Sequence, residues 1–340
     1  MVMKPRLAGL VTAVGLLIAA AIYTGYWFYA AQVARSAVEA WVDARRADGI
    51  EITHDGLSTG GFPFAVIIEM TAPAASAPRH PGAWRWRGDR LIARVRPWSL
   101  ARVELLLPER QRLVLRRGDG ERVIEIAAAG ALATLDFSAG RLADATLGVA
   151  GLTITADSAT TTIDKLDATL ATTATDPTRF GLTVADMLLP TAPTRALGRR
   201  VARAEIASEL VKIPPFLPSA RALAQWRDAG GVVDARALSL VWGALSLEGD
   251  GTLTVDERMR PMGAFTMRVK GYDALIEALV AADAIRARDA SLTLTILNLL
   301  AKRDDQGARV LTVPVTAQNG KLLLGPAKVL NLAPIPLPEG

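Results

Sequence analysis

From about residue 50 onward, apolar and polar residues alternate with a period of two, which predicts β-strands rather than helices. The clearest strand is Leu245–Val255, where leucine and valine side chains share one face and polar side chains the other. We expect the chain to turn at Pro261 and Gly263 and to return through 265–269 with the same alternation. One face of this hairpin is apolar and the other polar, which predicts an antiparallel sheet with one covered face.

Short turns that contain glycine predict hairpins between neighbouring strands. Gly88-Asp89 is expected to pair the strand before it with the strand after it, and Gly118-Asp119-Gly120 is expected to do the same. Near the end of the chain, Asn319-Gly320 is the strongest short hairpin signal. Such turns connect consecutive strands directly, so we expect a meander rather than crossovers.

Three segments with apolar residues at helical spacing predict helices that cover the apolar face of the sheet. Their ranges are 219–229, 272–286 and 289–302. The last segment is ambiguous, because residues 291–295 also alternate as a strand does. The sequence Pro-Thr-Ala-Pro at 190–193 is the best boundary between two halves of the chain, near 190–195, and it fits a loop equally well.

The N-terminus has a different pattern, in which a short basic head precedes an uncharged apolar run over 7–31. At about 1.5 Å rise per residue, this run is long enough to cross a hydrocarbon core of roughly 30 Å as one helix. Lys4 and Arg6 indicate that the head is cytoplasmic. The alternative is a cleaved signal peptide, because residues 19–21 are three alanines, a small-residue tract that a peptidase accepts.

Aromatic residues at the end of the apolar run predict a belt at the membrane interface. They are Tyr23, Tyr26, Trp27, Phe28 and Tyr29. The predicted organisation is a cytoplasmic head and transmembrane anchor over 1–31, an amphipathic helix over 32–48, and an exported β-rich domain over 49–340. The fold class is mainly β (α+β), with an extended, twisted, mostly antiparallel sheet and a few covering helices after the transmembrane helix.

The absence of cysteine excludes disulfides, thiolate catalysis and thiolate-ligated metals. Charge is concentrated between Arg79 and Arg122, where there are twelve arginines and five acidic residues. On an exported, tethered domain this segment suits anionic lipid headgroups or a protein partner better than nucleic acid. An ordinary solvated strand face explains it equally well. The candidate contact residues are Arg85, Arg87, Arg94 and Arg96.

The motifs in the chain do not predict an active site. Gly56–Gly60 matches the nucleophile elbow of α/β-hydrolases around Ser58, but an elbow requires a following helix, and a strand-like run follows Pro63 instead. His54 and His80 lack a second ligand at the spacing that a zinc site needs. We therefore predict a protein that is not an enzyme, with no catalytic residue, no metal site and no cofactor.

Three stretches together resemble a known family. The first is the anchor and the following helix with Gly60-Gly61-Phe62-Pro63-Phe64, whose two phenylalanine rings are expected to support the fold if they are buried. The second runs from Gln225-Trp226 through Gly230-Gly231 and Leu240-Val241-Trp242-Gly243 to Gly263, and the third is 319–326. On these stretches the chain resembles the uncharacterised bacterial family DUF2125. That family occurs in Gram-negative bacteria and has no assigned activity, so the resemblance implies no catalytic residue.

The C-terminal third is also similar to membrane-tethered envelope proteins of the AsmA-like kind. This resemblance implies an inner-membrane anchor, a periplasmic domain and an apolar face that accommodates lipid. Together with the sheet pattern, it predicts non-enzymatic handling of lipid or envelope components. The alternative is a structural or assembly partner of envelope membrane proteins, in which the apolar face is simply core. The candidate groove residues are Leu245, Leu247, Leu253, Val255, Phe265, Met267 and Val269.

Overall fold

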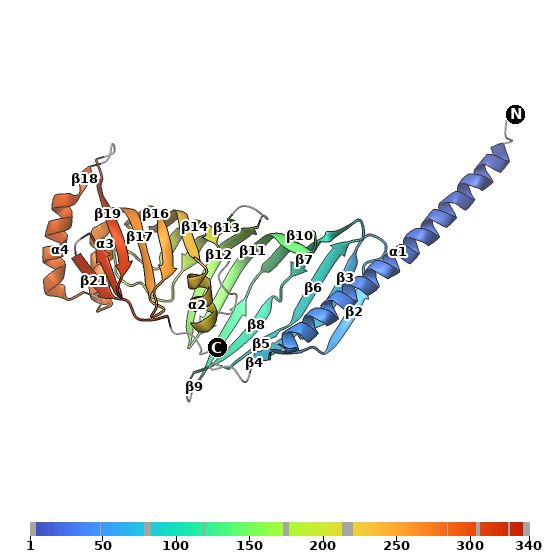
Figure 1. The fold of residues 1–340 in the computed structure, drawn as a ribbon, viewed down its shortest axis with the longest axis horizontal. Coiled ribbons are helices and arrows are strands. Elements are labelled where there is room, and N and C mark those ends of the chain that lie inside the picture. The colour runs from blue at the N-terminus through green and yellow to red at the C-terminus, as the bar shows by residue number, and fades with distance from the viewer. Residues whose placement is uncertain are drawn as a thin grey trace.

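The computed structural model describes residues 5–47, 49–77, 83–117, 120–172, 177–212, 220–283, 285–303, 307–325 and 327–335. In this part of the chain, all strands belong to one antiparallel sheet, which is long, open and twisted (Figure 1). The four helices are α1 (Pro5–Ala47), α2 (Ala220–Asp228), α3 (Tyr272–Ala281) and α4 (Ala287–Leu300). The predicted fold class is confirmed.

The first ten strands alternate in pairs between two leaves of the sheet. The first leaf contains β2 (Gly56–Gly60), β3 (Val66–Thr71), β6 (Arg90–Arg96), β7 (Ser99–Leu106) and β10 (Gly130–Ser138). The second leaf contains β1 (Glu51–Thr53), β4 (Ala74–Ala77), β5 (Trp84–Gly88), β8 (Arg110–Arg117) and β9 (Gly120–Ala127).

The two leaves meet at one long strand, from which the sheet continues as a simple meander. This strand, β11 (Arg141–Ala156), pairs with β10 through its first part and with β9 through its last part. The strands that follow are β12 (Ala159–Ala171), β13 (Thr178–Leu188), β14 (Arg200–Val211), β15 (Val232–Trp242), β16 (Leu245–Val255), β17 (Pro261–Lys270), β18 (Lys302–Arg303), β19 (Arg309–Gln318), β20 (Lys321–Leu324) and β21 (Ala327–Asn331).

Gly88-Asp89 does not form the predicted hairpin. Instead, the chain crosses there from β5 in the second leaf to β6 in the first, and backbone hydrogen bonds from Ala72 to Asp89 and from Gly88 to Pro73 hold the crossing. A Cβ atom on Gly88 would lie 2.5 Å from the Pro108 ring, so the close approach of neighbouring bends requires glycine. The sequence pattern alone cannot separate this crossing from a turn, because both use the same residue types.

Strand alternation changes phase at the crossing from β3 to β4. Val66, Ile68 and Met70 are buried in β3, whereas after the bend the same face of the sheet is reached by odd-numbered residues such as Ala75 and Ala77 in β4. An extra residue at the bend acts as a β-bulge does, because it turns the strand and re-aims its side chains. The same face therefore stays apolar on both leaves.

Other turns follow the prediction. Asn319 and Gly320 both have positive φ values, 52° and 70°, and join β19 to β20 as a two-residue hairpin turn. The strands on either side of 118–120 also pair, and residues 118 and 119 lie outside the described residues. The turn between β16 and β17 lies over 256–260, before the Pro261 that was expected to form it.

The three predicted covering helices are present, with α3 ending at Ala281 rather than at residue 286. The ambiguous segment is the helix α4. At the N-terminus, α1 is one continuous helix across the predicted division at 31–32. Strands β13 and β14 pair on either side of the loop that contains residues 190–193, so the sheet is continuous through that proposed boundary.

All four helices pack on one face of the sheet, which we call the inner face; the opposite face is the outer face. Trp27 of α1 packs with Val66 and Ile68, and Val42 near the other end of α1 packs with Ile52. At the far end of the sheet, α3 and α4 cover a core, and α2 covers a smaller cluster. The strand residues buried in these clusters include Leu245, Val269, Leu311 and Val313 under α3 and α4, and Val255 under α2.

The β16–β17 turn is held by the carboxylate of Asp256. Its Oδ1 atom accepts hydrogen bonds from the backbone amides of Arg258 and Arg260, both at 2.9 Å, and Oδ2 accepts one from the Arg260 side chain at 2.7 Å. Desolvation alone would raise the pKa of Asp256, but these hydrogen bonds outweigh it and place the pKa below its usual range.

We predict that Asp256→Asn lowers the free energy of unfolding of the full chain by about 1–2 kcal/mol at neutral pH, because the charge-assisted bonds are lost. A folded-state pKa below the unfolded value of about 3.9 stabilises the fold above that pH and ceases to do so as pH falls. Urea titrations should therefore separate wild type from variant at pH 7, and a second series at pH 3 should show a smaller difference. Asp250→Asn, on the exposed face of the same hairpin, is the control and should leave stability unchanged at both pH values.

Candidate functional site

A continuous row of paired residues crosses the inner face from the core under α1 to the core under α3. Each member lies directly opposite the next in the strand register, so all of them share one face. At about 4.8 Å between strands, the eleven intervals span roughly 53 Å before twist. The row, called here the apolar row, is Ile68, Ala93, Leu105, Ala133, Leu147, Ala168, Leu182, Ile206, Leu238, Gly249, Met267 and Val313.

The middle of the apolar row is uncovered in the described part of the chain. Its residues from Leu105 to Leu238 belong to none of the hydrophobic clusters that contain helix residues. They are half-buried against one another, and Ile206 is 38% exposed. A packed core would bury such side chains almost completely, so this stretch is an accessible apolar surface.

The outer face behind the row is polar. Asp167, Thr183, Glu205 and Ser239 are paired in sequence across four strands, one residue away from the apolar row on each strand. A hydrogen bond from Arg203 holds the pKa of Glu205 below its usual value, so this carboxylate remains charged. The contrast between the two faces gives the sheet a defined apolar side.

The seven predicted groove residues lie at the edge of this surface and are mostly covered. Leu245 and Val269 are buried in the core under α3 and α4, and Leu247 and Met267 pack against that core. Val255 is buried under α2. The last two residues, Leu253 and Phe265, are half-buried. The uncovered surface is displaced toward β10–β15, where alternation is broken by bulges and is harder to recognise in the sequence.

The four candidate arginines do not form one patch. Arg94 and Arg96 lie on β6, where both pair with Glu104 at 3.6 and 4.0 Å, near the end of the sheet held by Trp27. Arg85 lies on β5 and pairs with Glu121 at 2.9 Å. It is beside the cluster that contains Val42, and Val42 is about 22 Å further along α1 than Trp27. Arg87 is exposed on the same strand.

The Gly-rich motif around Ser58 has no elbow geometry. Gly56–Gly60 is the strand β2, and the next element is the strand β3 rather than a helix. Phe62 and Phe64, expected to support the fold if buried, are 51% and 74% exposed. His54 is exposed, and His80 lies outside the described residues. Among the described residues, no three His, Asp or Glu side chains gather as a metal site would require.

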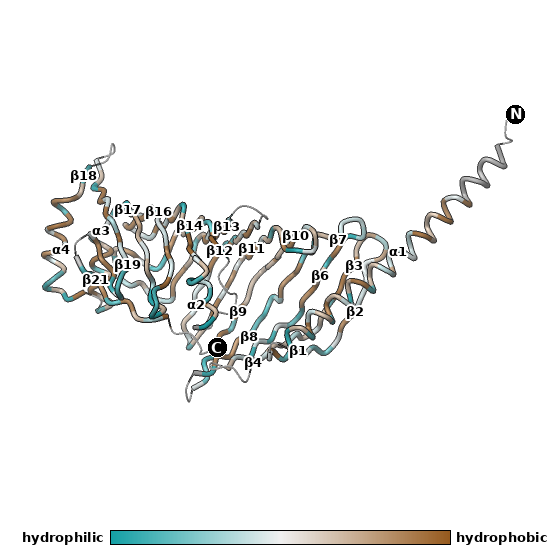
Figure 2. The backbone as a smooth tube through the Cα atoms, viewed as in Figure 1, coloured by the Kyte–Doolittle hydropathy of each residue, from teal (hydrophilic) through white to brown (hydrophobic). Residues whose placement is uncertain are grey.

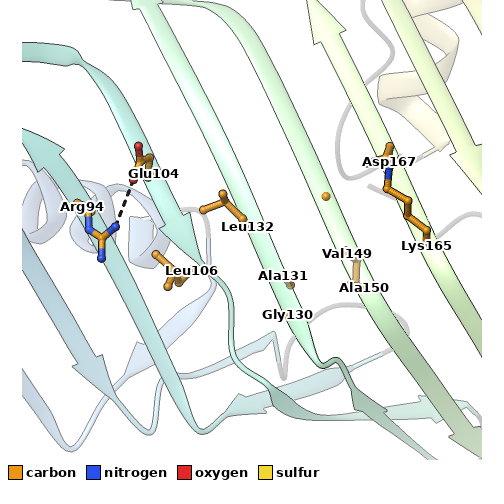
Figure 3. Close-up of a pocket in the computed structure, with 11 residues that line it drawn as sticks. Arg94, Glu104, Leu106, Gly130, Ala131, Leu132, Val149, Ala150, Lys165 and Asp167 are labelled. Atoms are coloured by element: carbon orange, nitrogen blue, oxygen red, sulfur yellow. Dashed lines mark ion pairs between the residues drawn. The ribbon is translucent and has the colours of Figure 1, made fainter.

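A hollow of about 440 Å³ lies on the outer face over β6, β7, β10, β11 and β12. Figure 3 shows an ion pair between Arg94 and Glu104 on one side of it and Lys165 with Asp167 on the other. All four charged side chains that line the hollow are therefore paired. Its remaining lining is Leu, Val, Ala and Gly, so it contains no nucleophile or free acid–base group.

A family model described as an uncharacterized protein conserved in bacteria (DUF2125) matches residues 27–334. The chain belongs to this family. No curated protein and no solved structure matches the chain. The match begins at Trp27, a residue through which α1 packs on the sheet, so the family covers the complete sheet together with the part of α1 that packs on it.

We predict that Leu245→Asp prevents folding of this family member, because it places an unpaired charge in a core where Leu245 is only 2% exposed. Leu132→Asp makes the same chemical change on the outer face, where Leu132 is 45% exposed, and should be tolerated. Thermal melts followed by circular dichroism compare the two full-length variants. Equal melting temperatures would contradict the assignment of Leu245 to the core.

Proposed function

We propose that this chain is a periplasmic protein, anchored in the inner membrane by α1, that binds the acyl chains of lipids along the uncovered apolar row without catalysing a reaction. The observation that carries the proposal is the row itself. Its middle is uncovered, it is longer than one extended acyl chain, and it joins the helix at the anchored end of the sheet to the far core.

The chemistry of the row favours an acyl chain over a peptide. Backbone groups of the central strands β11–β14 are already paired with neighbouring strands on both sides, so they cannot accept an added strand. The side chains of the uncovered part of the row, from Leu105 to Leu238, are Ala, Leu and Ile, which supply neither donors nor acceptors. A peptide laid on this face would leave its own amides unsatisfied, whereas an acyl chain has none to satisfy.

Membrane anchoring is supported by the length and composition of α1. It is the described helix that is long and apolar enough to cross a membrane, although a signal sequence would meet the same criterion. The N-terminal part of α1 projects away from the sheet (Figure 1) and exposes Leu16, Leu17 and Ile22 by more than half. Exposed aliphatic side chains on a free helix suit a lipid environment.

A second candidate function is assembly with other envelope proteins, and one observation favours it. The helix α4, at the far end of the sheet, exposes a stripe of aliphatic residues, and Figure 2 colours parts of this helix brown as hydrophobic. Leu292, Ile296 and Leu299 follow one another at helical spacing on this stripe, and Leu299 is 81% exposed. An apolar stripe of this kind suits a protein partner.

Crosslinking in cells tests the lipid proposal directly. With p-benzoylphenylalanine in place of Leu182 on the inner face, irradiation should attach phosphate-labelled lipid to the full-length protein. The control replaces Thr183, the next residue on the same strand, whose side chain points to the outer face. A lipid adduct at 182 and none at 183 is expected; a protein adduct alone at 182 would support the assembly role instead.

Topology has its own test. We expect alkaline phosphatase fused after Val33 to be active and a cytoplasmic reporter at the same place to be silent, because Lys4 and Arg6 precede the apolar run and the next basic residue is Arg35. The reverse pattern would refute the periplasmic placement. N-terminal sequencing of the mature protein separates an anchor from a signal peptide, since cleavage would give a chain that starts near Ile22.

A further inference from the structure

Three aromatic side chains fasten α1 to two loops at the end of the sheet. The Tyr23 hydroxyl donates a hydrogen bond to the Pro63 carbonyl at 2.5 Å, and the Tyr26 hydroxyl donates one to the Pro97 carbonyl at 2.7 Å. The indole N–H of Trp27 donates to the Ala65 carbonyl at 2.9 Å. The β2–β3 loop and the β6–β7 turn are therefore fixed at the level of a single turn of α1.

The same two loops expose large aromatic side chains. Phe64 and Trp98 are 74% and 63% exposed, and Phe62 makes an edge-to-face contact with Trp27 at 5.5 Å while remaining half exposed. The helix adds Phe28 and Tyr29, which are also exposed. Residues from three separate parts of the sequence thus form one aromatic rim around the point where α1 leaves the sheet.

The length of the free helix places this rim at the bilayer. Among the side chains of α1 that the structure describes, Tyr23 is the first with a hydrogen bond to the sheet end, and we take 7–22 as the apolar run that spans a membrane. Sixteen residues at about 1.5 Å rise per residue give about 24 Å, which is shorter than a hydrocarbon core of roughly 30 Å. The missing length corresponds to about four residues, which reaches Tyr26 and the loops bound to it.

Basic residues lie beside the rim. A hollow of about 280 Å³ next to Trp98 is lined by Arg94, Arg96 and Arg102 but by a single acid, Glu104. Arg102 donates to Asp136 at 2.7 Å, and this hydrogen bond raises the pKa of its guanidinium above the ordinary value. Arg94 and Arg96 share Glu104, which leaves one positive charge in excess at this level of the molecule.

We propose that the aromatic rim, Phe62, Phe64 and Trp98 with Phe28 and Tyr29, is a second membrane contact that inserts into the interface of the periplasmic leaflet. The proposal rests on the anchoring role of α1 proposed above. Aromatic side chains are favoured at that depth, and the arginines beside Trp98 face the anionic headgroups. The contact holds the sheet directly against the bilayer rather than on a flexible tether.

The rim also gives the apolar row a starting point. Ile68, the first residue of the row, lies four residues along the chain from Phe64, which is about 13 Å in an extended strand. Ile68 is buried under α1, so an acyl chain that leaves the leaflet at the rim meets the uncovered part of the row at Leu105, two strands or about 10 Å beyond Ile68. This assigns the entry point of the lipid to the end of the sheet held by α1.

Depth measurements on the full chain test the rim. Because the chain contains no cysteine, single variants Phe64→Cys and Trp98→Cys take one environment-sensitive fluorophore each. The proteins are reconstituted into vesicles of phosphatidylethanolamine and phosphatidylglycerol that carry a doxyl quencher in the acyl chains. Both labels should shift their emission to shorter wavelength and lose most of their fluorescence to the quencher.

Two further variants make the result decisive. Leu299→Cys labels the most exposed leucine of α4 at the other end of the sheet and should remain unquenched. Leu17→Cys labels the free part of α1 and should be quenched. Quenching at 17 without quenching at 64 and 98 would overturn the rim and leave the anchor intact. Equal quenching at 299 would overturn the rim as well, because it would indicate non-specific adsorption.

Discussion

The structure depends on keeping one face of a bent sheet apolar. Side chains of a strand alternate between faces, so a bend without compensation, or a shift of one residue, would carry polar side chains inside. At the crossing from β3 to β4 the chain adds a residue, and the apolar positions change from even to odd, as from Met70 to Ala77. The helix-covered cores and the uncovered row between them all follow from that phase change, because they are parts of the same face.

The single helix α1 makes the end of the sheet on which it packs rigid. It contributes Trp27 and Ala30 to one core and Val42 to another, so one straight element spans both leaves. A flexible linker between a membrane segment and a soluble domain would allow many orientations. Here α1 continues without interruption onto the sheet, so the orientation of the helix fixes the orientation of the sheet.

Charges on the outer face follow from the same two-sided design. Arginines on β5, β6 and β8 pair with carboxylates on nearby strands. Arg112 of β8 pairs with Glu125 on the adjacent β9, and Arg85 of β5 reaches Glu121 on β9, two strands away. Exposed pairs of this kind contribute little to stability. They keep this part of the outer face hydrated.

The sequence by itself determined the local features. A period of two, glycine turns such as Asn319-Gly320 and helical spacing in 219–229 each depend on residues close together in the chain, and each predicted the element that is present. The long apolar helix α1 could also be predicted from the sequence, because length and composition are local properties.

Tertiary structure alone decided which surfaces are covered. The predicted groove residues alternate just as the residues of the apolar row do. The helices α3 and α4 nevertheless cover Leu245 and Val269 and leave Leu182 uncovered. The alternation of a strand does not indicate where a helix will pack on it. Tyr23 and Trp27 satisfy the pattern of an interfacial belt, yet their polar atoms are bound to the sheet. Phe64 and Trp98, far apart in sequence, share one rim because two loops meet the same turn of α1. Such long-range contacts depend on the register of the whole sheet, which no segment of the sequence specifies alone.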